Sequence, residues 1–409
     1  MTVLLAGITY TDRVCIAVTA PQIMRDLHLS QVEMSVVFSA FTLAYALFEI
    51  PTGWWGDRVG TRRVLTRIVG WWSTFTMLTG AAANYGWLLV TRFLFGCGEA
   101  GAWPNVARTF SEWFPVTERG TAQGIFFMGA HLAGGLTPLL VTALLAHLRW
   151  RALFAIFGSV GFVWSAAWYW WFRDRPGEHP AANEEERAYI AAGCGVRKLA
   201  RGSTDWGGLL GNGSVAALCL MYFTQSYGFN FYVTWLPGYL RTVRGFSGWM
   251  LGVLAGLPLM LSVAADLLGG ITTDRMTRRY GLRTGRAAVG GASLAVAGVL
   301  LLGGTAVSNA MASAVMIGLA GAASNFLLGA AWSTCIDLGG ENSGVLSAAM
   351  NTSGQVGGIV CPLVFGYAVQ HWGNWTLPLG VMGVLYLAGA VCWAGVRPVS
   401  FLWGGGPGR

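Results

Sequence analysis

Charged residues are scarce in this sequence, and lysine is almost absent from it. Asp, Glu, Lys and Arg make up 11% of the 409 residues, whereas a typical soluble domain carries about 25%. Hydrophobic residues make up 54%, and they gather in long runs between short charged stretches. The shortage of charge excludes a soluble enzyme, a disordered chain and a nucleic-acid-binding protein, and it indicates an integral membrane protein.

Cysteine is also sparse, with seven residues and no Cys-x-x-Cys pair. We interpret the cysteines as small, reduced core residues, and we expect no metal site and no cofactor. A membrane enzyme would need a nucleophile, a metal cluster or paired catalytic carboxylates, and a membrane sensor would need a large soluble output domain. The sequence has no such spacing and no such domain, so we predict neither an enzyme nor any catalytic residue.

Long apolar runs predict the membrane topology. A helix that crosses a bilayer needs about 20 predominantly apolar residues, and these runs are too long and continuous for barrel strands. Twelve runs qualify and predict an all-α membrane protein in contact with the lipid bilayer. The predicted spans are Met1–Met24, Met34–Gly56, Val64–Ala83, Trp87–Phe110, Gly120–His147, Trp150–Phe172, Ser214–Leu240, Gly248–Thr272, Ala287–Thr305, Ala310–Thr334, Val345–His371 and Thr376–Val396.

The basic residues predict the orientation. An excess of Lys and Arg marks the cytoplasmic loops of a membrane protein. With both termini in the cytoplasm, most of the 26 basic residues fall on that side, among them Arg197, Lys198, Arg201 and Arg409. We therefore expect a multi-pass protein of the inner (plasma) membrane with both ends inside, and the net charge of +8 then needs no nucleic acid to explain it.

One long hydrophilic stretch, Arg173–Asn212, divides the spans into two sets of six. It predicts an N-terminal six-helix bundle at 1–172, a cytoplasmic linker at 173–213 and a C-terminal six-helix bundle at 214–409. Related motifs follow the second and the eighth span, at Gly53–Arg63 and Gly270–Arg279. This repetition indicates a duplicated six-helix unit.

The repeated motif predicts a conformational latch. Glycine lets helices approach closely, and an Asp followed by Arg can form charge-assisted bonds to a neighbouring helix terminus. The alternative is that these residues only set the topology and form a turn. The predicted latch residues are Gly53, Asp57, Arg58 and Arg62 in the first half, and Asp274 and Arg275 in the second.

These motifs resemble those of the major facilitator superfamily, whose Gly-x-x-x-Asp-Arg-x-Gly-Arg-Arg signature lies between helices 2 and 3; here Thr61 enters before the Arg pair. More narrowly, the chain resembles the anion:cation symporter family, which includes hexuronate, galactonate and glucarate transporters, sialin and the vesicular glutamate transporters. The resemblance spans nearly the whole chain and implies a twelve-helix fold of two six-helix bundles with pseudo-two-fold symmetry. Its motifs are Tyr10–Arg13, Arg92–Gly96, Gly98–Gly101, Thr234–Pro237 and Asn351.

Four charged residues inside the first and fourth spans are the strongest functional candidates, because ionisable groups inside a membrane are costly. Asp12 and Arg13 are adjacent and point about 100° apart on a helix, whereas Arg92 and Glu99 are two turns apart and share a face. An arginine binds a carboxylate with two parallel hydrogen bonds, so Arg13 is the predicted anion-binding residue.

Proton coupling is assigned to the two carboxylates. Burial favours the neutral form of a carboxylate, and a nearby arginine favours the charged form, so Asp12 and Glu99 are predicted proton sites with Arg92 as an exchangeable partner. The resemblance implies the same roles for Arg13, Glu99 and Asp12. A static buried ion-pair network is the alternative.

Polar and aromatic residues complete the predicted substrate site. Phenol, amide and indole groups can hydrogen-bond a carboxylate or hydroxyl, and a histidine titrates near neutral pH; for His131 a packing role is the alternative. We assign Asp266 and Asp337 to helix ends or to the latch. The further predicted site residues are Tyr10, Tyr45, His131, Asn230, Trp332 and Asn351.

The sequence thus predicts a monomeric secondary transporter that imports a small organic anion, a sugar acid or other carboxylate, with protons by alternating access. The alternative is an efflux antiporter or a facilitator of the same superfamily. The antiporter motif of helix 5 has a proline, which Gly129–Gly135 lacks. Only nine residues precede Tyr10, so we also expect the natural start to lie upstream.

Overall fold

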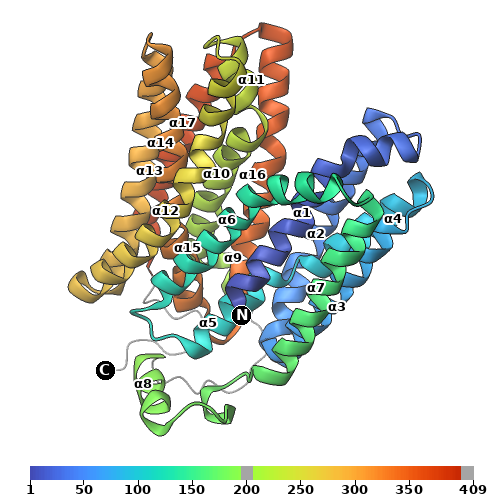
Figure 1. Ribbon diagram of the computed structural model, residues 1–409. Helices are drawn as coiled ribbons and strands as arrows, with labels where there is room; N and C mark the ends of the chain where they lie inside the picture. Colours follow the sequence, from blue (N-terminus) through green and yellow to red (C-terminus); the bar gives the residue numbers. More distant parts are fainter. Residues whose placement is uncertain (195–205, 398–409) are drawn as a thin grey trace. The chain divides into compact units, whose positions relative to one another are not determined.

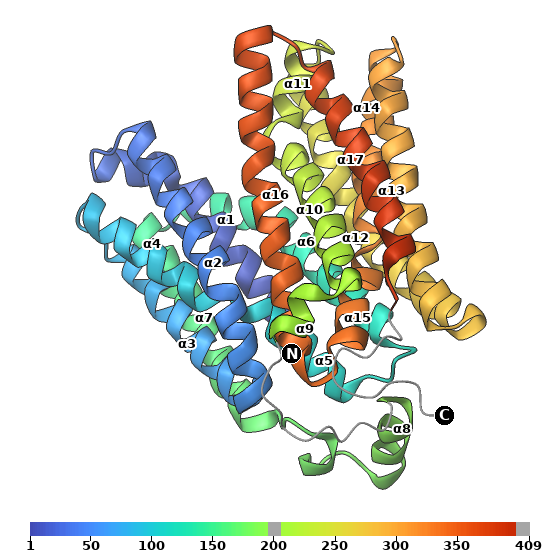
Figure 2. The same cartoon turned by 180° about the vertical axis from the view of Figure 1, so that it is seen from behind.

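The computed structural model describes residues 1–194 and 206–397. Arg197, Lys198, Arg201 and Arg409, four of the basic residues used for the predicted orientation, lie outside the described residues. Within the described ranges the chain is built of helices and contains no strand (Figures 1 and 2). The prediction of an all-α protein is therefore confirmed.

The first six predicted spans correspond to seven helices. Five spans are single helices, and the fourth is broken at Ala100–Gly101 into α4 and α5. The linker that follows carries the short helices η1 (Pro176–Glu178), α8 (Glu184–Cys194) and α9 (Trp206–Gly211). The helices of this half are α1 (Thr2–Asp26), α2 (Gln31–Val59), α3 (Thr61–Gly80), α4 (Tyr85–Glu99), α5 (Ala102–Trp113), α6 (Arg119–Leu145) and α7 (Trp150–Trp171).

The last six spans correspond to eight helices, and the seventh of the twelve is broken at Trp235 into α10 and α11. The tenth span is broken at Phe326–Leu327 into α14 and α15, and the short helix η2 (Gly340–Asn342) precedes α16. The helices are α10 (Gly213–Thr234), α11 (Leu236–Thr242), α12 (Gly248–Tyr280), α13 (Leu282–Ala306), α14 (Ala310–Asn325), α15 (Leu328–Gly339), α16 (Ser343–Trp372) and α17 (Thr376–Gly395).

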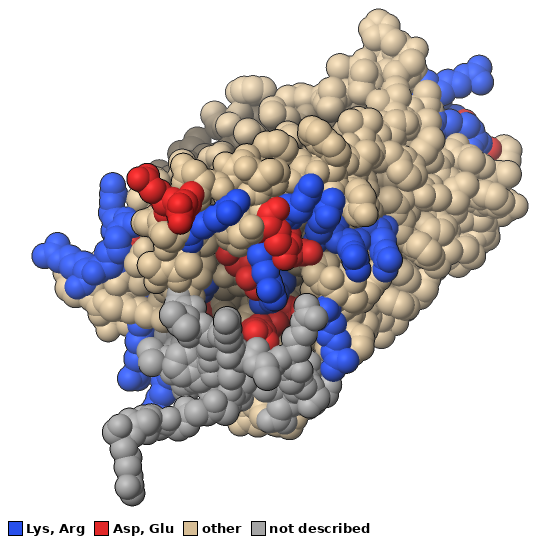
Figure 3. Space-filling view, turned by 90° about the horizontal axis from the view of Figure 1, so that it is seen from below, with Lys and Arg blue, Asp and Glu red and all other residues tan. Residues whose placement is uncertain are grey.

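Eight helical stretches of the described residues are long and apolar enough to cross a membrane, and one of them, 310–372, contains the tenth and eleventh spans. The helices outside these stretches are less apolar or shorter. For example, α3 begins with a group of arginines, and the break after α4 leaves only 15 residues in that helix. Charged side chains gather on the face seen from below (Figure 3).

Local sequence signals explain several helix ends. Ser30 and Glu33 form a reciprocal capping box at the start of α2, which satisfies otherwise unpaired backbone N–H groups. Gly60 joins α2 to α3 with φ of 95°, and Gly281 joins α12 to α13 with φ of 82°. Glycine adopts this left-handed region without steric cost, so both halves make the same tight turn with the same residue type.

The chain forms two compact units. Unit 1 consists of Met1–Trp113, Gly129–Val196 and Glu341–Ala348, and unit 2 of Phe114–Met128, Arg197–Gly340 and Ala349–Arg409. The first turns of α6 thus belong to unit 2, and the first turns of α16 belong to unit 1. The division at 1–172, 173–213 and 214–409 stays a prediction.

Helix neighbours repeat from one half to the other. In unit 1, α3 packs against α4 and α7, and α2 packs against α4. In unit 2, α13 packs against α14 and α17, and α12 packs against α14 (Figure 2). Because α12, α13, α14 and α17 occupy the places of α2, α3, α4 and α7 in the chain order, the packing repeats with the sequence motif.

Candidate functional site

An ion pair in unit 1 joins the first and fourth spans. Nε of Arg13, on α1, donates to Oε1 of Glu99, the last residue of α4. The glutamate is fully buried, whereas 22% of the Arg13 side chain is exposed. Arg13 is therefore the partly exposed member of this pair, and Glu99 is the enclosed one.

Three aromatic rings surround the Arg13 guanidinium. Its Cζ atom lies 4.7 Å from the ring centroid of Tyr45, 5.4 Å from that of Phe41 and 5.9 Å from that of Tyr10. A cation within about 6 Å of a ring face is attracted by the ring quadrupole. These contacts orient the guanidinium, while Glu99 balances its charge.

Asp12 and Arg92 are two further charged residues beside this pair. Both side chains are buried, and the electrostatic environment of Asp12 contains Glu99 and Arg92. The Cζ atom of Arg92 lies 4.1 Å from the ring centroid of Phe95 and 5.2 Å from that of Phe41. The structure thus brings Asp12, Arg13, Arg92 and Glu99 together, with Phe41 shared by both arginines.

Several atoms of this cluster have no hydrogen-bond partner among the described residues. They are both carboxylate oxygens of Asp12, Oε2 of Glu99, Nη2 of Arg13 and Nε of Arg92. A buried polar atom without a partner costs free energy, and natural structures keep few of them. The cluster therefore has spare acceptors for protons and a spare donor for an anion.

Tyr10 lies within an aromatic group that includes His131. The Tyr10 ring is edge-to-face with His131, with centroids 6.1 Å apart, and with Trp103, with centroids 6.0 Å apart. Gly134 permits this approach, since a Cβ there would lie 2.8 Å from Cδ1 of Tyr10. His131, from α6, therefore reaches the neighbourhood of Arg13 through Tyr10.

Each predicted site residue of unit 2 has its own contacts within that unit. Nε1 of Trp332 donates to the Tyr222 hydroxyl at 3.1 Å, and Nδ2 of Asn230 donates to the Ser226 carbonyl of its own helix at 3.0 Å. Asn351, on α16, is buried, with 6% of its side chain exposed. The described contacts place these three residues in unit 2, and their role in binding stays a prediction.

The predicted latch motif of the first half caps a helix. The Asp57 carboxylate accepts hydrogen bonds from the backbone N–H groups of Gly344 (2.9 Å) and Val345 (2.8 Å) in the first turn of α16. An anion is stabilised there by the helix dipole and the free N–H groups. Gly53 allows the approach, because a Cβ there would lie 2.7 Å from the Gly344 carbonyl oxygen.

The arginines of this motif make other contacts. Arg58 lies over the ring of Trp54 at 4.5 Å, and Arg62 donates to the Tyr169 carbonyl at the end of α7. The cation nearest to Asp57 is Arg108 on α5, with Nε 3.7 Å from Oδ1. Sequence reasoning missed Arg108, since it resembles any basic residue at the cytoplasmic end of a span.

The second half repeats the cap. The Asp274 carboxylate accepts from the backbone N–H groups of Gly120 (2.9 Å) and Thr121 (2.6 Å) at the start of α6. Two arginines that sequence reasoning also missed complete the network: Arg286 contacts Asp274 at 3.3 Å and Asp337 at 3.2 Å, and Arg119 contacts Asp337 at 2.8 Å.

The charged residues around Asp274 are more deeply buried than those around Asp57. Asp274, Arg286, Asp337 and Arg119 are all at most 6% exposed, whereas Arg108 is 16% exposed and also pairs with the more exposed Glu112. Arg275 is exposed and makes no ion pair among the described residues. The structure thus groups Asp57 and Asp274 with arginines from outside the motif.

Comparison with known proteins shows the family of this chain. The family described as "Major Facilitator Superfamily" matches residues 2–362. This chain is a member of the major facilitator superfamily. It is accordingly a multi-pass membrane transporter and not an enzyme, and the predicted twelve-helix fold is confirmed.

Several relatives of this transporter are named as probable transporters of organic anions. The chain is 35% identical to "Probable sulfoacetate transporter SauU" of Cupriavidus necator, over 96% of this chain and 91% of the relative. It is 30% identical to "Probable galactarate/D-glucarate transporter GudP" of Bacillus subtilis, over 95% of this chain and 88% of the relative. These relatives confirm the resemblance to the anion:cation symporter family.

A solved structure shows the same fold. The proton:xylose symporter XylE matches this transporter with a TM-score of 0.74 over 97% of this chain and 94% of its own, at 14% identity. At that identity the similarity concerns the fold alone, and the substrate has to be argued from the site.

Proposed function

We propose that this transporter carries a small organic anion into the cell together with protons, by alternating access. The observation that carries the proposal is the Arg13–Glu99 pair, in which a partly exposed guanidinium is anchored by a fully buried carboxylate. The ring cluster of Tyr10, Phe41 and Tyr45 holds that guanidinium in place.

The substrate is an anion with a planar or tetrahedral acid group. Arg13 binds it through its guanidinium, because the side chain is partly exposed and an arginine fork suits a carboxylate or a related oxyanion. The buried Nη2, which has no hydrogen-bond partner among the described residues, is the donor left for the anion. Relatives named for sulfoacetate and galactarate/D-glucarate support this class. Tyr10, Tyr45 and His131 supply polar groups nearby. The polar candidates of unit 2 are Asn230, Trp332 and Asn351.

Protons are coupled to the anion by charge compensation. When a proton binds Oε2 of Glu99, the acid no longer balances the charge of Arg13, and an uncompensated buried charge is costly. The substrate anion then supplies the missing negative charge. Asp12 and Arg92 form the second proton-dependent pair, so the loaded cluster stays close to neutral while the two bundles rock between states.

The two helix caps serve as the conformational latch of this cycle. Asp57 holds the start of α16, and Asp274 holds the start of α6, so release of either cap frees a helix that is divided between the two units. Arg108, Arg119 and Arg286 strengthen the caps, while Arg58, Arg62 and Arg275 set the topology of the loops.

The proposal is tested first by uptake into proteoliposomes. We expect acidic outside pH to drive accumulation of sulfoacetate or D-glucarate, because each imported anion brings a proton with it, and we expect xylose to be ignored. Uptake that runs down the anion gradient and does not respond to pH would favour the facilitator. Anion extrusion driven by proton entry would favour the antiporter.

A thermal-shift screen of the purified protein against organic acids identifies the ligand. Ligands that bind only the folded state raise its stability by about 2.7 kcal/mol at a concentration 100 times the Kd. We expect C2 to C6 acids with a carboxylate or sulfonate to raise the melting temperature, and the matching neutral alcohols to leave it unchanged. Equal stabilisation by the neutral alcohols would contradict an anion site.

Substituting the two latch aspartates should lower the stability of the folded protein by different amounts. Asp274→Asn leaves buried arginines short of a counter-charge, so we expect it to lose about 3 kcal/mol of stability. Asp57→Asn should lose about 1 kcal/mol, because Arg108 keeps Glu112. Thermal unfolding in detergent measures both, and equal losses would contradict the difference in burial. The double variant Asp274→Asn/Arg286→Gln should recover part of the loss.

A further inference from the structure

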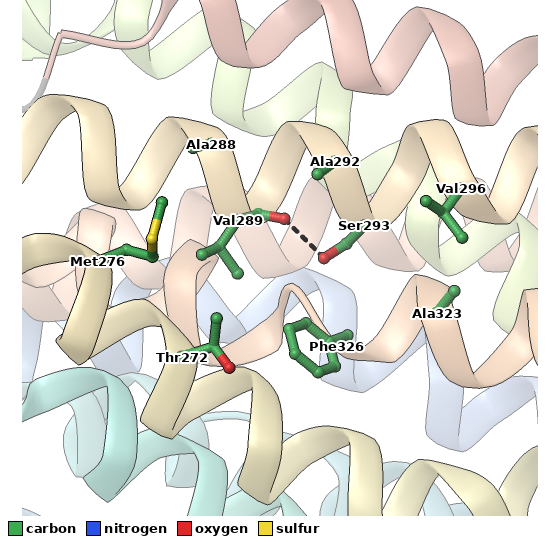
Figure 4. A pocket seen from close by; sticks show the side chains of 9 residues that line it. All are labelled: Thr272, Met276, Ala288, Val289, Ala292, Ser293, Val296, Ala323 and Phe326. Atoms are coloured by element: carbon green, nitrogen blue, oxygen red, sulfur yellow. Dashed lines mark hydrogen bonds between the residues drawn. The ribbon is translucent and has the colours of Figure 1, made fainter. Parts of the chain in front are cut away.

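A groove in unit 2 lies between α12, α13 and α14 and has a volume of about 450 Å³. It exists because the tenth span is broken. After the break α15 packs closely on α12, since a Cβ on Gly329 would lie 2.8 Å from the Cα of Gly270. Phe326, at the break, forms the floor of the groove, and Met276 and Val289 lie around it (Figure 4).

The walls of this groove are apolar and open to the outside of the helix bundle. Ala288 and Ala292 of α13 are small and leave room, and Val296 is 50% exposed. The hydroxyl of Ser293 is bonded to the Val289 carbonyl of its own helix at 2.6 Å (Figure 4). An exposed apolar groove on a membrane-spanning helix faces lipid rather than water.

The depth of the groove matches one leaflet. Ala288 and Val296 lie about 9 and 21 Å along α13 from its first residue, at 1.5 Å per residue. The hydrocarbon core of one leaflet is about 15 Å thick. An acyl chain that enters the groove therefore has its headgroup near the turn that joins α12 to α13.

Exposed arginines stand at that turn. Thr272, Met276 and Arg279 follow one face of α12 at spacings of four and three residues, so Arg279 continues the groove wall toward the end of the helix. Arg283 follows two residues after Gly281. Both arginines are exposed, and neither makes an ion pair among the described residues. On the side that we propose to be cytoplasmic, such basic groups attract anionic headgroups.

We infer that this groove binds one anionic phospholipid of the inner leaflet. One acyl chain lies between α12, α13 and α14, and the headgroup phosphate is bound by Arg279, while Arg283 adds positive charge at the same turn. The occupant is a lipid because the apolar groove leads along one face of α12 to Arg279, and neither a soluble anion nor a neutral chain would use both the groove and the arginine.

The test is a lipid titration of the purified full-length protein, with bound lipid counted by native mass spectrometry. Dioleoyl phosphatidylglycerol should bind at least fivefold more tightly than dioleoyl phosphatidylcholine, which has the same chains. Arg279→Gln should weaken phosphatidylglycerol binding about fivefold. Ala292→Trp, which fills the groove from its lipid-facing wall, should abolish this binding.

Matched controls separate this site from general adhesion of lipid. Arg63→Gln removes an exposed arginine from the corresponding loop of the first half, and Val299→Trp adds the same bulk on α13 outside the groove. Both should bind phosphatidylglycerol like the parent. Parental binding by Ala292→Trp and Arg279→Gln would overturn the inference, as would equal affinity for the two lipids. Glycerol 3-phosphate that displaces the lipid at equal concentration would show a soluble-anion site instead.

Discussion

We expect Glu99→Gln to abolish proton-driven accumulation while exchange of the anion across the membrane continues. Glutamine keeps the shape of the side chain and its hydrogen-bonding oxygen, but it cannot change its charge. The variant therefore mimics the protonated state permanently, in which Arg13 is released for the substrate. Binding and exchange need only that state, whereas accumulation needs Glu99 to lose its proton inside the cell.

The measurement compares two assays on the same proteoliposomes. Under an inward proton gradient of one pH unit, a symporter of one proton per anion can accumulate substrate about tenfold, and Glu99→Gln should reach only equilibration. Counterflow of labelled substrate against unlabelled substrate should stay within a few-fold of the parent. Glu99→Asp is the control that retains a titratable group and should retain coupling. Normal accumulation by Glu99→Gln would remove Glu99 from the proton path.

We expect Arg13→Ala to weaken substrate binding by at least about thirtyfold. Truncating one partner of a buried, hydrogen-bonded charge pair costs about 2–5 kcal/mol, and each 1.4 kcal/mol is a factor of ten in affinity. Arg13→Lys keeps the charge but loses the planar fork, so its affinity should lie between those of the parent and the alanine variant. Titration calorimetry with the acid identified by the thermal-shift screen measures all three.

A folding defect can be separated from a binding defect. Arg13→Ala leaves the buried Glu99 without its partner, whereas the double variant Arg13→Ala/Glu99→Gln removes both charges and should recover stability. If Arg13 binds the substrate, the double variant folds well and still fails to bind. Parental affinity in either variant would show that the anion binds elsewhere.

The four charges of the cluster were predictable because they interrupt apolar runs, where any ionisable group is conspicuous. Their neighbours were harder to find. Phe41 lies one turn before Tyr45 on α2 and contacts both arginines, and that spacing was a usable signal. Trp103 packs against Tyr10, but the sequence has 20 tryptophans, and nothing local marks this one.

The latch shows the opposite case. Asp57 and Asp274 stood out through a repeated motif, and both cap a helix. The arginines nearest to them, Arg108 and Arg286, come from other helices, and at the end of a span a basic residue is equally well explained by topology. The sequence therefore favoured the arginines inside the motif. In the fold Arg58 lies over Trp54, Arg62 donates to a backbone carbonyl and Arg275 is exposed.

By itself the sequence determined that the chain is a helical membrane protein, how many spans it has and which charges are buried in them. These properties follow from the cost of placing polar groups in lipid, and that cost acts on each segment separately. Only the tertiary structure decided that Arg13 pairs with Glu99, that Arg286 joins Asp274 to Asp337, and that a break in the tenth span opens a groove. Such contacts depend on which helix faces which neighbour, and a sequence carries that information only through the packing of the whole chain.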